Sequence, residues 1–167
     1  MSASVIFNIH LALGYAPWLM IFAAYGWPKL RVMDPAQAQR AIAALHSFRF
    51  FGLVFLLPGV VGPGLPSGFA TYAAYGDFAT SLLAMGAFAT IRVRPLFWAF
   101  VVAFNVVGMI DLLGDYSLGV AQDLPRASGA LGAAYVIPIV YVPLLMITHV
   151  AAFALIARRA APLASQA

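Results

Sequence analysis

The chain has 167 residues, of which 64% are hydrophobic and only 8% are charged, and its mean hydropathy is +0.96. A soluble domain carries about 25% charged residues because its surface faces water, so this composition excludes a water-soluble globule and predicts one membrane domain over residues 1–167. The net charge of +4 does not indicate nucleic-acid binding, and the lack of cysteine excludes disulfides and thiolate metal sites.

Five apolar segments are each long enough for a helix that crosses a bilayer, which needs roughly 20 residues. They are continuously apolar, without the alternation of a barrel strand, so helices are expected. We therefore predict an all-α membrane protein built as a five-transmembrane-helix bundle, with residues 114–129 as an outer connection. The predicted spans are residues 5–25, 41–61, 69–90, 96–113 and 131–157.

The connections between these spans differ in charge. The basic residues on one side of the predicted bundle are Lys29, Arg31, Arg40, Arg92, Arg94, Arg158 and Arg159. Arg126 lies alone on the other side, and Arg49 lies inside a span. The positive-inside rule makes the basic side cytoplasmic, which places the N-terminus outside and the C-terminus in the cytoplasm. The expected location is the bacterial inner membrane, with lipid, further copies of the chain or a larger membrane complex as partners.

Local signals mark several helix boundaries. Asp34 followed by Pro35 is typical of an N-cap and the first turn of a helix. Pro95 is expected to open the fourth helix. Pro138 and Pro143 lie within the fifth span, where each removes a backbone hydrogen bond, so this helix is expected to be kinked.

Two charged side chains lie well inside the spans, where topology does not account for them. Arg49 and Asp77 lie on antiparallel helices, each on the order of 12 Å from its own membrane face at about 1.5 Å per residue. In a core of about 30 Å, their levels are then within about 6 Å of each other. A charge at the bilayer centre costs at least ~2.5–3.5 kcal/mol, which favours an Arg49–Asp77 ion pair. In the alternative, Arg49 extends back to the cytoplasmic interface.

Other polar residues accompany Asp77 and predict a pocket that opens outward. Thr80 and Ser81 follow Asp77 at i+3 and i+4, on the same helix face. The residues expected to form the pocket are His10, Asp77, Asn105 and Asp111. Such a pocket would bind or pass a small molecule or an ion, coupled to protonation of Asp77 or a histidine. In the alternative, Asp111 is exposed to water, because it lies within one turn of the outer boundary.

His46 and His149 lie in the cytoplasmic half of their spans, at similar depth on different helices. A bis-histidine haem b needs such a pair, so a haem b electron-transfer subunit is an alternative function. The alternative for the residues themselves is a hydrogen-bonded core histidine at 149 and an interfacial histidine at 46. A third possibility for the protein is a non-catalytic membrane subunit of a larger complex.

Catalytic signatures are absent from the sequence. It contains no Gly-x-Ser-x-Gly, His-Glu-x-x-His, phosphate loop or dinucleotide fingerprint. An intramembrane aspartyl enzyme needs two convergent aspartates, and the predicted spans place Asp77 and Asp111 at different levels. Enzymatic activity is therefore not expected.

The stretch from Phe48 to Asp77 reads F-R-F-F-G-L-V-F-L-L, then G-P-G-L-P-S-G-F-A, then Y-G-D. It resembles a pattern in small bacterial multi-spanning membrane proteins that have no assigned function. The resemblance covers 30 of the 167 residues. It implies that Arg49, Pro66 and Asp77 are family features, and it implies no activity.

Overall fold

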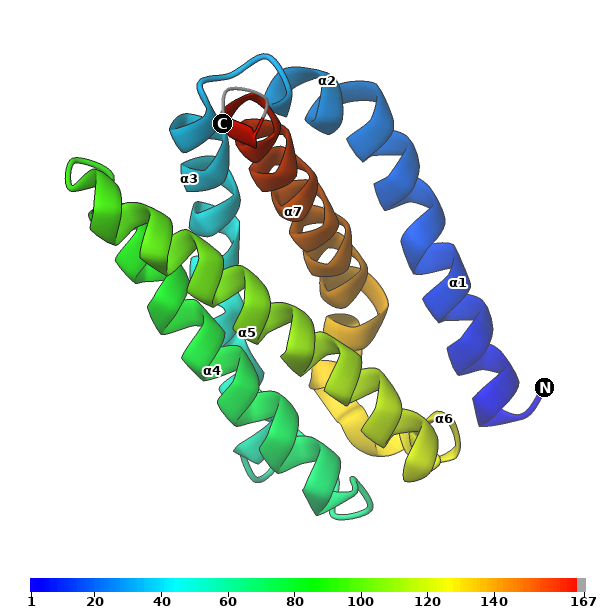
Figure 1. The fold of residues 1–167 in the computed structure, drawn as a ribbon. Coiled ribbons are helices and arrows are strands. Elements are labelled where there is room, and N and C mark those ends of the chain that lie inside the picture. Colours follow the sequence, from blue (N-terminus) through cyan, green and yellow to red (C-terminus); the bar gives the residue numbers. More distant parts are fainter. Residues whose placement is uncertain (165–167) are drawn as a thin grey trace.

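The computed structural model describes the backbone of residues 1–164 and the side chains of residues 1–159, and every regular element in it is helical (Figure 1). The α-helices are α1 (Ala3–Ile21), α2 (Trp27–Leu30), α3 (Pro35–His46), α4 (Ser67–Ala89), α5 (Arg94–Ala121), α6 (Leu124–Ala127) and α7 (Val142–Ala164). Two segments are π-helical, η1 (Phe22–Gly26) and η4 (Ile137–Tyr141), and two are 3-10 helical, η2 (Ser47–Leu56) and η3 (Ser128–Tyr135). The all-helical prediction is confirmed for the described residues.

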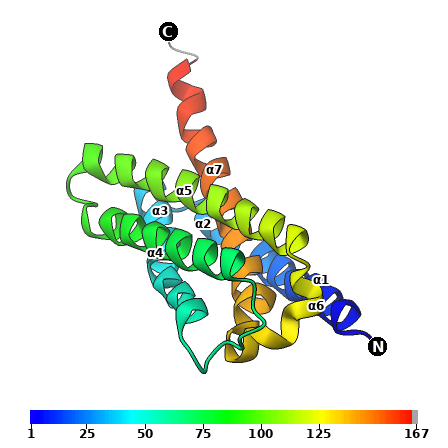
Figure 2. The same ribbon diagram turned by 90° about the horizontal axis from the view of Figure 1, so that it is seen from below.

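The helices form a bundle with one helix along its side. Helix α4 packs against both η2 and α5, and α7 packs against α3 and α5 (Figures 1 and 2). Helix α1 contacts α6, η4 and α7. The N-terminus and the end of α7 lie at opposite ends of the bundle (Figure 1).

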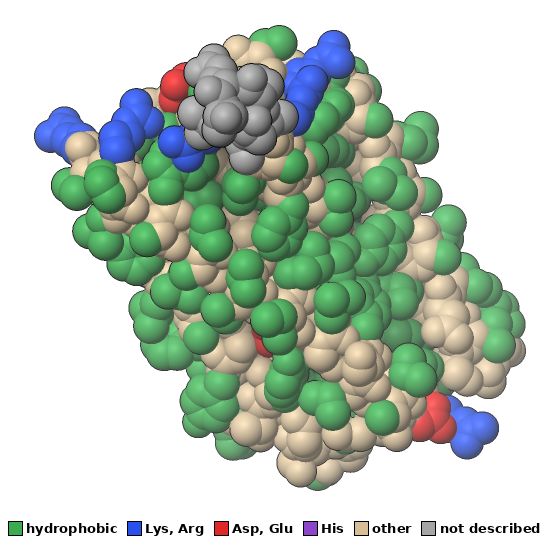
Figure 3. All heavy atoms as spheres, viewed as in Figure 1, with side chains coloured by type: hydrophobic (Ala, Val, Ile, Leu, Met, Phe, Trp, Pro, Cys, Tyr) green, Lys and Arg blue, Asp and Glu red, His purple; other side chains and the backbone are tan. Residues whose placement is uncertain are grey.

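The surface and the long helices indicate membrane association. Among the described residues, three helical stretches are long and apolar enough to cross a membrane, namely Ala3–Leu30, Arg94–Ala121 and Ile137–Arg159. Large apolar side chains such as Leu13, Met20 and Ile110 are exposed, whereas the charged residues Arg49, Asp77 and Asp111 are buried. Figure 3 shows hydrophobic side chains over the middle of this face and most basic side chains at one end. This distribution is the reverse of that in a water-soluble domain.

The second predicted span, residues 41–61, differs from a continuous α-helix. It begins as α3, where Asp34 Oδ1 caps the helix by accepting from the backbone N–H groups of Ala36 (3.0 Å) and Gln37 (3.1 Å), as predicted. After His46 the backbone tightens into η2. The Ser47 hydroxyl donates to the carbonyl of Ala43, an arrangement that bends helices. A 3-10 run of this length is uncommon, since most stop after three or four residues.

The fourth predicted span, residues 96–113, is too short. Pro95 opens α5 as expected, but this helix continues to Ala121, for 28 residues or about 42 Å. The residues beyond 113 include Asp115 and Ser117, which make the sequence less apolar. Both are compatible with a helix, because Asp115 Oδ1 is buried and the Ser117 hydroxyl donates to the carbonyl of Leu113. Much of the predicted outer connection, residues 114–129, is therefore helical.

The remaining spans agree better with prediction. Helix α4 lies within two residues of the predicted 69–90. The first span is a continuous helical stretch from α1 through η1 to α2. The fifth begins irregularly, with a break at Gly132 (φ 53°, ψ −129°) and the π-helix η4 around Pro138. Proline and π turns are known causes of helix kinks.

Candidate functional site

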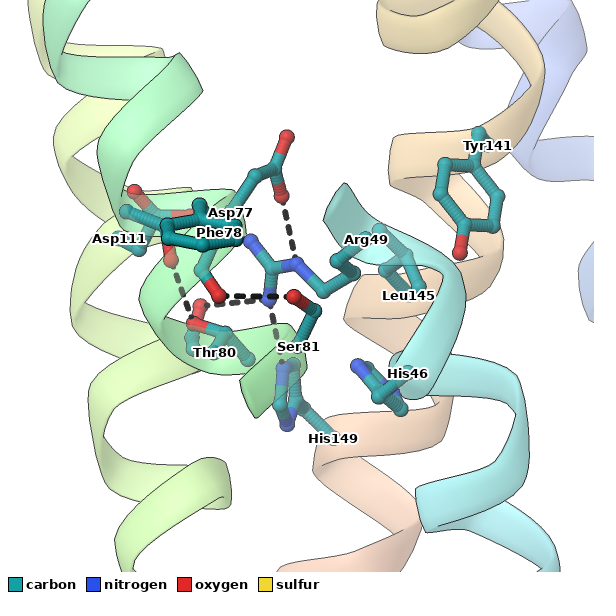
Figure 4. Close-up of polar contacts among 12 residues, drawn as sticks. His46, Arg49, Asp77, Phe78, Thr80, Ser81, Asp111, Tyr141, Leu145 and His149 are labelled. Carbon is teal, nitrogen blue, oxygen red and sulfur yellow. Dashed lines mark hydrogen bonds and ion pairs between the residues drawn. The ribbon is translucent and has the colours of Figure 1, made fainter. Parts of the chain in front are cut away.

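Arg49 lies at the centre of a buried polar cluster. Its side chain is 0% exposed, and its Nε donates to Asp77 Oδ1 at 2.6 Å (Figure 4). Its Nη2 forms a second ion pair with Asp111 Oδ2. Its Nη1 donates to the carbonyl of Gly108 at 3.3 Å and lies 3.1 Å from His149 Nε2. The predicted Arg49–Asp77 pair is therefore present, and Arg49 does not extend to the interface.

Four segments position this cluster, which we call the Arg49 cluster and define as Arg49, Asp77, Asn105, Asp111 and His149. Arg49 lies on η2, Asp77 on α4, Asn105 and Asp111 on α5, and His149 on α7. All five residues are buried. The planar guanidinium has donors on several edges, which allows one side chain to join all four segments.

The pairing of Asp111 corrects two expectations. Asp111 is only 3% exposed, so it is not a residue that faces water at the boundary of the bundle. Asp77 and Asp111 also converge on one arginine, although the predicted spans placed them at different levels. Both errors have the same cause, because α5 continues ten residues beyond Asp111 to Ala121 and so carries Asp111 into the interior.

Three glycines make room for these charges. A Cβ at Gly52 would collide with the Asp77 carboxylate, and one at Gly76 would collide with that of Asp111. A Cβ at Gly108 would lie 2.7 Å from Arg49 Nη1 and 2.5 Å from His149 Nε2. Sequence reasoning missed this role for Gly52. Small residues next to charges in apolar segments were the signal, since they let helix backbones approach closely.

The hydrogen bonds of His149 define its tautomer. Asn105 Nδ2 donates to the carbonyl of Val101 at 2.8 Å, which leaves Asn105 Oδ1 as an acceptor. His149 Nδ1 lies 2.9 Å from this oxygen and therefore donates to it. The other ring nitrogen, Nε2, is then the acceptor for Arg49 Nη1. His149 is thus a neutral ring that connects Arg49 to Asn105.

This assignment predicts the effect of removing the amide. Asn105→Leu leaves the His149 Nδ1–H buried without an acceptor, and we expect it to lower the free energy of unfolding by about 1–3 kcal/mol. Unfolding of the purified protein in detergent measures the loss. Ser117→Ala is the control on the same helix, because Ser117 is exposed, and surface changes usually stay within about 0.5 kcal/mol. Equal losses for the two variants would contradict the assignment.

His46 packs directly on His149, and this geometry does not fit haem. The two ring centroids are 4.1 Å apart. Histidines that ligate haem from two sides have the macrocycle between them, and rings in contact leave no such space. Both nitrogens of His149 are also occupied, and His46 Nε2 bonds to Thr148 Oγ1 at 3.0 Å. Within the described residues, no group of three or more potential metal ligands is suitably arranged.

Three carboxylates lie near the single positive charge of Arg49. Asp115 follows Asp111 at i+4, on the same face of α5. Asp111 Oδ1 and Asp115 Oδ1 are both buried without a hydrogen-bond partner. If ionised, Asp77, Asp111 and Asp115 carry three negative charges against one positive charge on Arg49, a net of −2. Unpaired charge is costly in a bundle interior, so this region has the chemistry to bind a proton or another cation.

The predicted outward pocket of His10, Asp77, Asn105 and Asp111 is not formed as a unit. His10 lies on α1 beside η3, where its Nδ1 is 2.9 Å from the Tyr135 hydroxyl. It is separated from the cluster because α1 lies along the side of the bundle. Asn105 lies against His149, whereas Asp77 and Asp111 flank Arg49.

Thr80 and Ser81 are buried on α4, and Figure 4 shows them on the side that faces Arg49. Their hydroxyls donate to carbonyls of their own helix, Thr80 to Gly76 at 2.8 Å and Ser81 to Phe78 at 2.7 Å. Their oxygens still have lone pairs that can accept, so both residues stay candidates for the site.

A family model described as a domain of unknown function, DUF8737, matches residues 6–157. The chain belongs to this family. The matched range includes the whole Arg49 cluster, and the family description states no activity. Neither a curated protein nor a solved structure matches this DUF8737 member.

Proposed function

We propose that this DUF8737 protein is a multi-pass protein of the bacterial inner membrane that binds or passes a small molecule or ion, with the Arg49 cluster as its proton-binding element. In this proposal the chain crosses the membrane five times, with α3–η2 and α4 completing the three long apolar stretches. The N-terminus is outside and the C-terminus is cytoplasmic. The surrounding partner is the lipid bilayer.

The distribution of basic residues supports this topology. The α2–α3 and α4–α5 connections lie with the end of α7 at one end of the bundle, and together with the adjoining parts of α2, α3 and α5 they carry seven lysines and arginines (Figures 1 and 3). Arg126, at the other end, is exposed and paired with Asp123 at 3.2 Å. Cytoplasmic connections carry such an excess of basic residues.

The excess of carboxylates around Arg49 is the observation that carries the function. Arg49 bonds to both Asp77 and Asp111 while Asp115 lies one turn away. Polar groups at this depth are expensive in a membrane, and intramembrane ionisable residues mark ion and proton pathways. A proton on Asp111 removes one of the two negative charges that hold Arg49 and leaves the guanidinium paired with Asp77.

The backbone around Arg49 supports a mobile role for this residue. Arg49 lies on η2, a 3-10 segment that continues α3 and whose hydrogen-bond geometry is poorer than that of an α-helix. In transporters, interrupted membrane helices form binding sites near the midplane. A change in the charge of Asp111 therefore acts on a 3-10 segment rather than on a regular α-helix. Protonation is in this way coupled to a change in the position of η2.

Proton flux tests the proposal. We expect liposomes that contain the wild-type protein and a trapped pH-sensitive dye to acidify when a proton gradient is applied. Asp111→Asn removes the titrating carboxyl and is expected to slow the flux at least about tenfold, which corresponds to about 1.4 kcal/mol in barrier. Asp123→Asn is the control, because Asp123 is exposed and remote from Arg49. Equal flux from wild type and folded Asp111→Asn, or none from wild type, would overturn the function.

A further inference from the structure

A cavity of about 110 Å³ is lined by Asp115, which lies one helical turn beyond Asp111 of the Arg49 cluster, and by residues of α6. Residues from α1, η2, α4, α5, α6, η4 and α7 line it. The cavity therefore lies where the side helix α1 meets the rest of the bundle. The lining includes the rings of Phe7, Phe55, Phe69 and Tyr116 and the carboxylate of Asp115.

Apart from the Asp115 carboxylate, the Asn8 amide and the Tyr116 hydroxyl, the wall of this cavity is apolar and largely aromatic. Phe7, Phe55, Phe69 and Tyr116 contribute rings, and those of Phe55 and Phe69 pack edge to face with centroids 5.6 Å apart. Asp115 contributes the carboxylate, and its Oδ1 is buried without a partner. Aromatic faces attract cations, and a carboxylate pairs with ammonium groups. The Tyr116 hydroxyl is occupied by that of Tyr15, at 2.6 Å.

The charges around the cavity also favour a positively charged occupant. Arg49 already pairs with Asp77 and Asp111, and within the described residues no basic side chain forms an ion pair with Asp115. Either a proton on the carboxylate or a positively charged occupant of the cavity would neutralise Asp115. A neutral or anionic occupant would leave the carboxylate unpaired or add to the repulsion.

The volume limits the apolar part of such an occupant. An apolar cavity of about 150 Å³ holds one benzene ring. A cavity of about 110 Å³ therefore holds a short alkyl group rather than an extended hydrocarbon or a fused ring system.

We infer that this cavity binds a small organic ammonium ion, with its alkyl group against the aromatic rings and its N–H groups donating to the Asp115 carboxylate. The inference rests on the proposed function, because Asp115 is part of the excess of carboxylates next to the Arg49 cluster and the inference names the substrate class that this excess would bind. When the ammonium ion enters, a proton held by Asp115 is released to water, so that one positive charge replaces another. The ammonium ion and the proton thus compete for the same carboxylate.

Direct binding tests this inference without any gradient. Isobutylammonium and the neutral isobutanol have the same carbon skeleton, and saturation-transfer NMR on the protein in lipid nanodiscs compares their binding. We expect wild type to bind the amine at least about tenfold more tightly than the alcohol, a difference of about 1.4 kcal/mol. Asp115→Asn is expected to abolish this preference, and Asp123→Asn to retain it.

A second variant covers the case in which Asp115→Asn does not fold. Gly119 lies on α5 and lines the cavity, and the nearest atom to an added Cβ there is 3.6 Å away. The Cβ of a valine at this position therefore fits, and its two methyl groups are expected to occupy the cavity, so we expect Gly119→Val to abolish binding of both probes. Equal binding of amine and alcohol to wild type, or amine binding that survives Gly119→Val, would overturn the inference. Amine binding without proton flux would overturn the proposed function alone, and flux without amine binding would overturn this inference alone.

Discussion

Arg49→Met is expected to lower the free energy of unfolding by about 3–5 kcal/mol, the usual cost of removing one partner from a buried ion pair. The methionine fills similar space but leaves Asp77 and Asp111 buried without their cation. It also removes the donor to the Gly108 carbonyl and to His149 Nε2. Reversible unfolding in mixed detergent micelles measures the difference.

Two comparisons separate the loss of charge from the loss of side-chain volume. Arg126→Met removes an arginine whose side chain is 80% exposed and ion-paired with Asp123, and exposed pairs contribute about 0–1 kcal/mol. Arg49→Met combined with Asp77→Leu and Asp111→Leu removes the orphaned carboxylates, and we expect it to recover most of the stability. A single Arg49→Met variant as stable as Arg126→Met would show that the cluster contributes nothing to folding.

Gly76→Ala is expected to destabilise the protein by about 1–3 kcal/mol, the usual cost of overpacking a tight interior. The new Cβ would occupy the position of the Asp111 carboxylate oxygen, so the carboxylate or one of the helices α4 and α5 must move. Because this carboxylate pairs with Arg49, we also expect the proton flux to fall as it does in Asp111→Asn. Unfolding and flux assays on one preparation measure both effects.

Gly119→Ala is the matched control for Gly76→Ala. Gly119 lies inside α5, where an added Cβ makes only ordinary contacts, the nearest at 3.6 Å. Alanine is favoured over glycine within a helix by roughly 0.5–1 kcal/mol, so we expect this variant to be slightly stabilised. The same substitution thus has opposite signs at two positions. Two stabilised variants would contradict the close approach of α4 and α5 at Gly76.

The pair between Arg49 and Asp77 was predictable because depth in a membrane follows from counting residues along a helix. The cost of isolated charge in lipid then favours partners at the same level. The same reasoning failed for Asp111, because it depended on where α5 ends. Helix boundaries are poorly marked when a polar residue such as Asp115 can turn inward, so Asp111 was placed at the boundary instead of beside Arg49.

The two histidines, His46 and His149, show a second limit of prediction from the sequence. Their similar depth was visible in the sequence, and depth alone made a haem site an alternative. The direction in which each ring faces depends on how α3 and α7 pack. Here that packing brings the rings of His46 and His149 into contact and uses His149 to connect Arg49 with Asn105.

The sequence by itself determined the helical class, the lipid-facing character and the two unequal ends of the molecule, because composition and periodic spacing act locally along the chain. It also determined that Arg49 needs a partner. Only the tertiary structure decided that this arginine holds two aspartates while a third carboxylate faces a cavity, because those contacts join η2, α4, α5 and α7 across sequence separations of 28 to 100 residues. Three glycines permit those approaches, and they do so only in the packed bundle.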